Sequence, residues 1–294
     1  MTVRHILRCT DQHRIPRLPL DTAPSALLRG GMLTKPQATL NRLRDGKDQL
    51  VRSFFKHPKV HSWLLENLMI SQRGQDIQAE QMDAIQKVTK SIGDDWKTAP
   101  YYDIAEADMD KQWSDTLWPF ISDCDFSTVL DLAAGHGRNS EKLRHHAGTL
   151  YIADINQENI DFCKQRFGNG SQYRYVLSSG TTLPYVSDDS ISLIYCFDSM
   201  VHFDSDTVRQ YLKEFKRILR PGGRAFCHHS NYTSRPTGDF HQNPHWRNFM
   251  SKELFEHYTH KEGLRMVRSA VKNWGPDEAF ATLDCFSLVE RPLA

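Results

Sequence analysis

The segment Val129-Leu-Asp-Leu-Ala-Ala-Gly-His-Gly-Arg-Asn-Ser140 constrains the fold of this 294-residue chain more than any other. Its apolar residues indicate a short buried strand, Gly135 and Gly137 indicate a turn, and Asn139 and Ser140 suit the start of a helix. Glycine lets the backbone approach a ligand, and a helix N-terminus offers free N–H groups. The segment therefore predicts a nucleotide-binding corner in an α/β fold.

Two features indicate which nucleotide this corner binds. The dinucleotide fingerprint G-x-G-x-x-G fits poorly, because Ser140 occupies the third glycine position. Asp131 lies in the strand ahead of the turn, where a carboxylate favours a cationic ligand over a pyrophosphate. The next strand, 149–154, ends at Asp154, about 20 residues past the turn, which is the spacing at which an acid takes two ribose hydroxyls.

At these residues the sequence resembles the class I S-adenosylmethionine-dependent methyltransferases. Their first motif, (V/L)-L-D-x-(G/A)-x-G-x-G, reads here from Val129 to Gly137, with Ala133 where glycine is commoner. Two later features extend the resemblance, namely Phe197-Asp198 at the end of an apolar strand and the turn Leu219-Arg-Pro-Gly-Gly223 after a helix pattern. The resemblance covers residues 101–291.

The resemblance implies an α/β fold, namely a Rossmann-like, doubly wound, seven-stranded and mostly parallel sheet with an N-terminal helical extension or cap. We place the arm and cap at residues 1–95 and the methyltransferase domain at residues 96–294. In the first part, prolines predict an irregular basic arm over 1–58, and apolar spacing over 60–92 predicts two helices broken near Gly74. In the second part we expect helices over 156–167, 205–219 and 251–263, and strands over 149–154, 172–177, 224–229, 266–272 and 281–290.

The resemblance also implies the cofactor S-adenosyl-L-methionine, released as S-adenosyl-L-homocysteine. The resemblance implies that Asp154 binds the ribose and that Ile155 lies beside the adenine. It also places Ser179 at a position where the family usually has an acid. Tyr102 and Trp113 lie where the family has its lid, so they either close over the sulfonium by cation–π contact or pack the lid helices. The predicted cofactor-binding residues are Asp131, Ala133, Gly135, Gly137, Arg138, Asp154, Ile155, Ser179, Gly180, Phe197, Tyr102 and Trp113.

Methyl transfer to a hydroxyl requires alignment of the acceptor and a base, and histidine is the natural base near neutral pH. His202 follows the Phe197-Asp198 strand end, and His228 and His229 end the fifth predicted strand. Side chains alternate along a strand, so at most one of that pair faces the site. We predict His202, then His229, as the catalytic base, with packing as the alternative role of His202. Asp198 is predicted to orient a histidine or to bind substrate hydroxyls.

The loop after the fifth strand mixes polar side chains with Trp246, which is typical of a hydroxylated acceptor. We therefore predict O-methylation of a small molecule or saccharide. The alternatives are N-, C- or S-methylation of a metabolite, and a catalytically silent cofactor-binding domain. No metal site is predicted. His202, Asp204 and Asp206 cluster in sequence, but Asp204 or Ser205 is expected to cap a helix instead.

The charge and composition of the chain indicate which kinds of partner and which location to expect. The 37 Lys and Arg residues balance 36 acids, which argues against a nucleic-acid partner. No apolar run reaches membrane-spanning length and no signal-peptide core is present, so a cytoplasmic location is expected. Six scattered cysteines form no C-x-x-C pair, and Cys196 and Cys227 are expected to be reduced core thiols. The N-terminal helices could mediate a homodimer.

Overall fold

The computed structural model describes residues 58–97, 101–237, 239–274 and 281–293, with side chains from residue 74 onward. The chain divides into two compact units, Met1–Met69 and Ile70–Ala294. The basic arm predicted over residues 1–58 lies outside the described residues, apart from its last residue. The predicted division between residues 95 and 96 stays a prediction.

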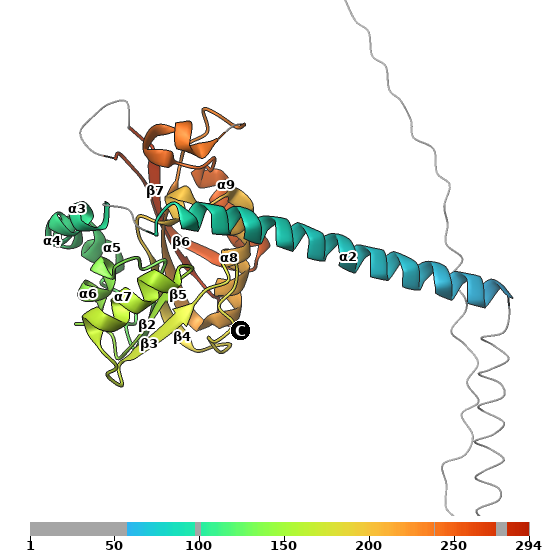
Figure 1. The fold of residues 1–294 in the computed structure, drawn as a ribbon, viewed down its shortest axis with the longest axis horizontal. Helices are drawn as coiled ribbons and strands as arrows, with labels where there is room; N and C mark the ends of the chain where they lie inside the picture. Colours follow the sequence, from blue (N-terminus) through green and yellow to red (C-terminus); the bar gives the residue numbers. More distant parts are fainter. Residues whose placement is uncertain (1–57, 98–100, 238, 275–280, 294) are drawn as a thin grey trace, which may run out of the picture. The chain divides into compact units, whose positions relative to one another are not determined.

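The second unit contains a seven-stranded sheet (Figure 1). The strand order is β3-β2-β1-β4-β5-β7-β6, and all neighbouring strands are parallel except β7, which is antiparallel to β5 and β6. This is the predicted Rossmann-like fold, and the predicted strands fall within a few residues of the observed ones. The strands are β1 (Thr128–Leu132), β2 (Thr149–Asp154), β3 (Tyr173–Leu177), β4 (Ile191–Cys196), β5 (Leu219–Ser230), β6 (Arg265–Lys272) and β7 (Asp284–Glu290).

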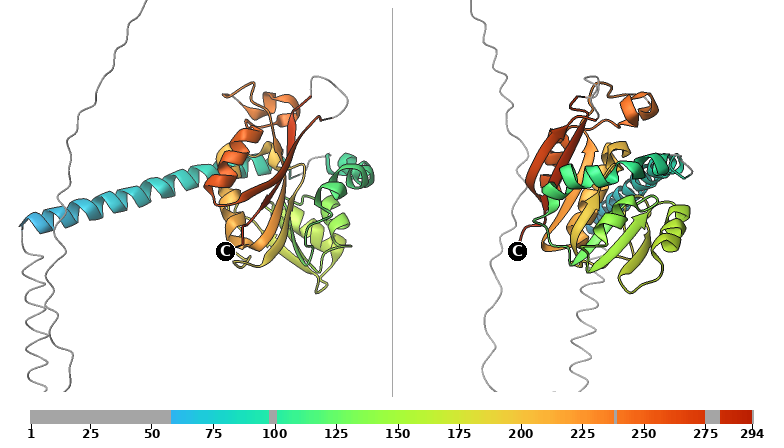
Figure 2. Two further views of the ribbon diagram at one scale, coloured as in Figure 1. Left: turned by 180° about the vertical axis from the view of Figure 1, so that it is seen from behind. Right: turned by 90° about the vertical axis from the view of Figure 1, so that its left-hand side faces the viewer.

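Helices cover both faces of the sheet, and the views in Figure 2 show the same layering as Figure 1. Residues of α4, α5, α6 and α7 pack on one face, and residues of α8 and α9 pack on the other. The helices are α2 (Pro58–Asp94), α3 (Tyr101–Ala107), α4 (Met109–Gln112), η1 (Trp113–Leu117), α5 (Trp118–Ile121), α6 (Arg138–Leu143), α7 (Gln157–Phe167), η2 (Met200–His202), α8 (Ser205–Ile218), η3 (Phe240–Gln242), η4 (Pro244–Trp246) and α9 (Lys252–Lys261).

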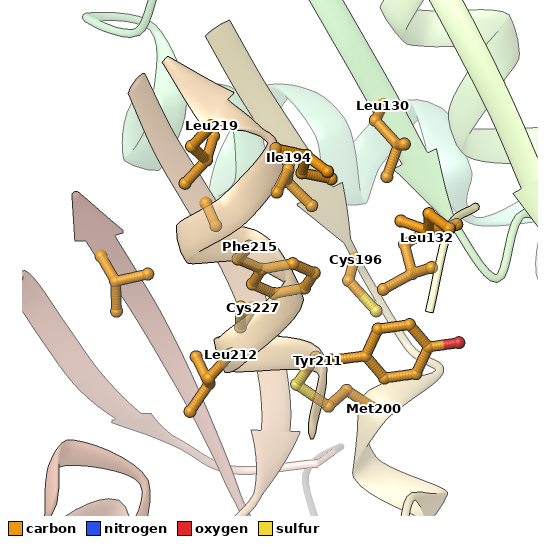
Figure 3. Packing of buried hydrophobic residues seen from close by; sticks show 14 of the residues in the cluster. Leu130, Leu132, Ile194, Cys196, Met200, Tyr211, Leu212, Phe215, Leu219 and Cys227 are labelled. Carbon is orange, nitrogen blue, oxygen red and sulfur yellow. The ribbon is translucent and has the colours of Figure 1, made fainter. Parts of the chain in front are cut away.

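The central strands are apolar on both sides, because each faces a layer of helices. In β4, Ile194 and Cys196 join the cluster under α8, whereas Leu193 and Tyr195 join the cluster on the opposite face. Figure 3 shows Phe215 of α8 over the first of these clusters. The alternation fixes which side of each strand end can reach a ligand.

Several local predictions can be compared with the structure. The two helices predicted around Gly74 are wrong, because α2 is continuous through it. A helical glycine costs about 1 kcal/mol relative to alanine, which a long helix tolerates. Asp204 caps α8 as predicted, accepting from the N–H of Asp206. Cys196 and Cys227 are free, buried thiols, as predicted. Among the described residues, no helix combines the length and apolarity needed to cross a bilayer.

Candidate active site

A cavity of about 890 Å³, its open mouth included, lies at the carboxyl ends of β1, β2 and β4. This is where open α/β sheets bind ligands, since the strand order reverses between β1 and β4. The lining includes ten of the sequence-predicted residues or their neighbours in the motif, namely Tyr102, Ala133, Gly135, His136, Arg138, Asp154, Ile155, Phe197, Asp198 and His202.

The turn after β1 uses left-handed backbone three times. Ala133, Gly135 and Gly137 have φ angles of 58°, 56° and 82°. A Cβ on Gly135 would lie 2.4 Å from the ring of Tyr102, which packs over the turn. Gly135 therefore needs to be glycine for its backbone and for space, whereas Ala133 carries backbone strain of about 1–2 kcal/mol.

Asp154 closes the turn from the end of β2. One carboxylate oxygen accepts from the N–H of Gly135 at 2.9 Å, and the other accepts from the N–H of Asn156 and from Nδ2 of Asn159. Burial raises the pKa of this carboxyl, although these hydrogen bonds oppose the shift. Each oxygen has two lone pairs, so the carboxylate retains the capacity to accept from a ligand.

The last turns of α2 form another wall of the cavity. Thr89, Ile92 and Gly93 line it beside Ile155. Nδ2 of Asn156 donates to the carbonyl of Gly93 at 2.7 Å, which ties the helix end to β2. The segment predicted as a separate cap thus contributes directly to the cavity.

Asp198 holds a charged network at the end of β4. It has a left-handed φ of 57°, and its carboxylate lies 2.5 Å from Nη2 of Arg138 and accepts from the hydroxyl of Tyr101. Burial alone would raise the pKa of Asp198, but the nearby guanidinium charges, that of Arg138 first and then that of Arg247, bring it below its usual value. The site therefore holds an ionised Asp198 whose charge Arg138 compensates.

His202 lines the cavity beside Trp96, with ring centroids 4.7 Å apart. Its Nδ1 lies 2.9 Å from the carbonyl oxygen of Trp246. A carbonyl only accepts, so Nδ1 carries the proton and Nε2 of the neutral ring carries the lone pair. Burial, with the charge of Arg247, lowers the pKa of His202 to about 4.

Two motif residues support the turn from behind. Asp131 is fully buried and does not line the cavity; it accepts from the Ser140 hydroxyl at 2.6 Å. Burial raises the pKa of Asp131 to about 7, so it is a weak counter-charge for a cation. Gly137 also lies behind the wall, where a Cβ would meet Phe167. In this structure both residues support the turn and α6, and their contact with the cofactor stays a prediction.

The loop after β3 places two more of the predicted residues outside the lining of the cavity. Ser179 is exposed and its hydroxyl accepts from the N–H of Thr182, so it stabilises the loop. Ser178, the preceding residue, lines the cavity instead. Gly180 has a left-handed φ of 92°, and a Cβ there would meet Ile155 and Thr89 at 2.9 Å. Gly180 therefore permits the packing of the wall without lining it.

Trp113 and His229 lie away from the cavity. Trp113 packs against Trp118, His146 and Tyr195, so its predicted contact with the cofactor is replaced by packing. His229 is fully buried, stacks on Phe255 with centroids 3.9 Å apart, and bonds Ser287. Burial lowers the pKa of His229 to about 3. It is a core histidine, and the prediction of a base at this position is corrected.

Sequence reasoning missed several lining residues. Asn139 and Asn159 each have a buried carbonyl oxygen without a hydrogen-bond partner among the described residues, and Trp96 has such an N–H. Asn139 stands within the first motif and Trp96 within an aromatic-rich stretch, which are weak signals. Thr89, Ile92, Ser178 and Tyr211 had no signal that singled them out, because tertiary packing brings them to the cavity.

Parts of the sequence are similar to known proteins. Residues 129–223 match the family described as a methyltransferase domain. Methyltransferase GfsG of Streptomyces halstedii is 33% identical over 101 residues, which cover 33% of this chain and 35% of that protein. The demethylmenaquinone methyltransferase of Clavibacter sepedonicus is 29% identical over 98 residues, which cover 33% of this chain and 38% of that protein. These matches span well under half of either relative.

The fold also recurs in solved structures. A crystal structure described as an S-adenosylmethionine-dependent methyltransferase from Clostridium acetobutylicum aligns with a TM-score of 0.51 and 18% identity, covering 66% of this chain and 100% of that one. Geranyl diphosphate C-methyltransferase from Streptomyces coelicolor gives 0.50 and 13%, covering 67% and 87%. Identity this low shows a shared fold alone.

The sequence motif, the sheet order and the family match agree. Residues 129–223 match a methyltransferase domain, and the motif at Val129–Gly137 and the strand order are those expected of a class I S-adenosylmethionine-dependent methyltransferase, a family whose cofactor is S-adenosylmethionine. The residues present fit this cofactor. Asp154 and the oxygens of Asn139 and Asn159 that lack a partner in the described part of the chain could accept from donors such as ribose hydroxyls and an ammonium, and Ile92 and Ile155 could form an apolar wall for a base.

Proposed function

We propose that this chain transfers a methyl group from S-adenosylmethionine to a hydroxyl of a small molecule or saccharide, with His202 as the base. The observation that supports this acceptor is the adjacent pair of His202 and Trp96 in the cavity wall. Nε2 of His202 has a lone pair, and Nε1–H of Trp96 is a buried donor without a partner among the described residues. A hydroxyl can donate to the first and accept from the second, whereas a carbon acceptor can do neither.

The chemistry divides between cofactor and protein. Bound S-adenosylmethionine supplies a methyl group on a sulfonium, whose sulfur leaves as the neutral thioether of S-adenosylhomocysteine. His202 takes the hydroxyl proton at Nε2 as the oxygen–carbon bond forms and the carbon–sulfur bond breaks. Because its pKa is lowered to about 4, the ring is neutral and able to accept throughout the physiological pH range. The charge of Asp198 stabilises the imidazolium, which then returns its proton to water.

In this proposal, residues that line the cavity bind the cofactor. Asp154 and Asn159 take the ribose hydroxyls, and Ile92 and Ile155 enclose the adenine. Tyr102, whose hydroxyl is tied to the carbonyl of Trp96 at 2.8 Å, covers the glycine turn and excludes water from the transferring methyl group.

C-methylation is a second candidate. It is favoured by the name of one similar protein, the ubiquinone/menaquinone biosynthesis C-methyltransferase of Hahella chejuensis, which is 28% identical over 106 residues. N- or S-methylation and a silent cofactor-binding domain remain alternatives. The cytoplasmic location and a homodimer through the N-terminal helices also stay predictions.

The test is transfer of a labelled methyl group to a panel of alcohols, saccharides, amines, thiols and carbon acids. We expect transfer to hydroxyls, with kcat/KM about tenfold lower in Trp96→Phe, which removes one N–H donor and keeps an apolar ring. Trp118→Phe is the matched control, because Trp118 packs against Phe126 and His146 away from the cavity. Transfer to amines, thiols or carbon without transfer to any hydroxyl would contradict the proposal.

A further inference from the structure

A buried ion pair between Arg247 and Asp284 lies near His202 without lining the cavity. Arg247 is 2% exposed and Asp284 is 0% exposed. Nε and Nη2 of Arg247 each lie 2.8 Å from a different oxygen of Asp284, and the guanidinium stacks on Trp274, 4.5 Å from the ring centroid. Such a bidentate pair has fixed geometry, but its desolvation cost makes it a poor source of stability compared with apolar packing. A positioning role is therefore the better explanation.

One branch leads from this pair to His202. Nη1 of Arg247 donates to the carbonyl of His245 at 3.0 Å. His245 and Trp246 have left-handed φ angles of 47° and 55°, which cost about 1–2 kcal/mol each in residues other than glycine. This strained turn aims the carbonyl of Trp246 at Nδ1 of His202, at 2.9 Å. The tautomer and orientation of His202 thus depend on a turn that Arg247 holds.

A second branch leads from Asp284 to Asp198. Nε2 of the fully buried His228 lies 3.1 Å from Asp284, although it is poorly aligned for a strong hydrogen bond. Nδ1 of His228 accepts from the backbone N–H of Asp198 at 3.1 Å. Asp198 is itself left-handed, so His228 holds a second strained backbone in place.

Three of the six non-glycine residues with positive φ among the described residues are therefore tied to one ion pair. We propose that Arg247 and Asp284, with His228, are positioning residues that hold the strained backbones of His245, Trp246 and Asp198, and thereby orient His202 and Asp198 for the reaction. This inference rests on the proposed function. None of the three lines the cavity, so each acts through another residue.

The experiment follows the ring nitrogens of His202 by 15N NMR in the full chain, with the signals assigned by their absence in His202→Gln. The wild-type ring is expected to be protonated at Nδ1 alone. Arg247→Lys keeps the charge but cannot form two parallel bonds, so we expect a mixture of tautomers. Arg247→Met also removes the charge and should raise the His202 pKa. The other charged or titratable groups that act on this ring are Asp198 and His228.

Arg217→Lys is the matched control, since Arg217 forms an equally bidentate pair with Glu214 on α8 away from the cavity. It should leave the His202 signals unchanged, and Arg247→Lys should lower kcat about tenfold while this control does not. Asp284→Asn repeats the test if Arg247→Lys does not fold. Unchanged Nδ1 protonation in the folded variants overturns the inference. Failure of the wild type to bind S-adenosylhomocysteine overturns the proposed function and leaves the NMR result intact.

Discussion

Ala133 has a backbone conformation that glycine adopts at much lower cost. Its φ of 58° lies in the left-handed region, and the residue lines the cavity in the turn after β1. The motif that it belongs to has glycine or alanine here, and the positive φ explains why glycine is the commoner residue.

Replacement of Ala133 by glycine should therefore stabilise the domain by roughly 0.5–1 kcal/mol, after the larger entropy of unfolded glycine is subtracted from the relieved strain. Urea denaturation followed by tryptophan fluorescence measures this change. Ala134→Gly is the control. Ala134 is buried but has no positive φ, so its replacement should destabilise the domain by about 1 kcal/mol. Equal losses for both variants would contradict the strain assigned to Ala133.

The sequence identified the residues that approach the cavity from the ends of β1, β2 and β4. Asp154, Phe197 and His202 were found because a strand end faces the ligand crevice whatever the details of packing. The side of the sheet toward which a strand residue points could not be predicted in the same way. Asp131 and His229 lie on strands whose two sides are both buried, so the sequence gives no sign of which side each one takes.

The end of α2 forms part of the cavity wall. The hydroxyls of Thr89 and Thr207 lie 2.7 Å apart in a buried contact between α2 and α8, and Asn156 bonds the carbonyl of Gly93. Apolar spacing predicted helical structure in this segment, though as two helices, and could not reveal what the segment packs against, because both contacts join residues more than sixty positions apart.

Gly93→Ala tests this role of α2. The added Cβ would lie 2.6 Å from Cγ2 of Ile155, so Ile155 must move within the cavity wall. We expect affinity for S-adenosylhomocysteine to fall roughly tenfold, about 1.4 kcal/mol. Gly74→Ala on the same helix is the control, because nothing lies within 4 Å of its added Cβ. It should leave affinity unchanged and favour the helix by up to about 1 kcal/mol. An unchanged affinity for Gly93→Ala would remove α2 from the site.

At the scale of the whole molecule, buried histidines make stability depend on pH. Burial lowers the pKa of His229 to about 3, whereas an unfolded histidine titrates near 6.5. Between these values the unfolded state binds one more proton at this residue. The contribution of His229 is therefore fully present above about pH 6.5 and is lost as the pH falls, by about 1.4 kcal/mol per unit.

Asp131 has the opposite effect on the pH dependence of stability. Its pKa is raised to about 7 in the folded state, so the folded state binds the extra proton and is stabilised as the pH falls. We therefore predict how the free-energy cost of removing His229 changes between two pH values, because this change does not include the contribution of Asp131. His229→Asn should destabilise the protein less at pH 5 than at pH 7, by about 2 kcal/mol in urea denaturation. His257→Asn, on the exposed side of α9, should cost under about 0.5 kcal/mol at both pH values. A pH-independent cost for His229→Asn would contradict its neutral burial.

We propose that the cavity at the ends of β1, β2 and β4 binds S-adenosylmethionine. Calorimetric titration of the full chain with S-adenosylhomocysteine tests it most directly, with Asp154→Asn and, as a control, the exposed Asp188→Asn. We predict one site per chain with a roughly micromolar Kd, at least tenfold weaker in Asp154→Asn and unchanged in Asp188→Asn. Absence of binding to the wild type, or equal binding by Asp154→Asn, would contradict the account.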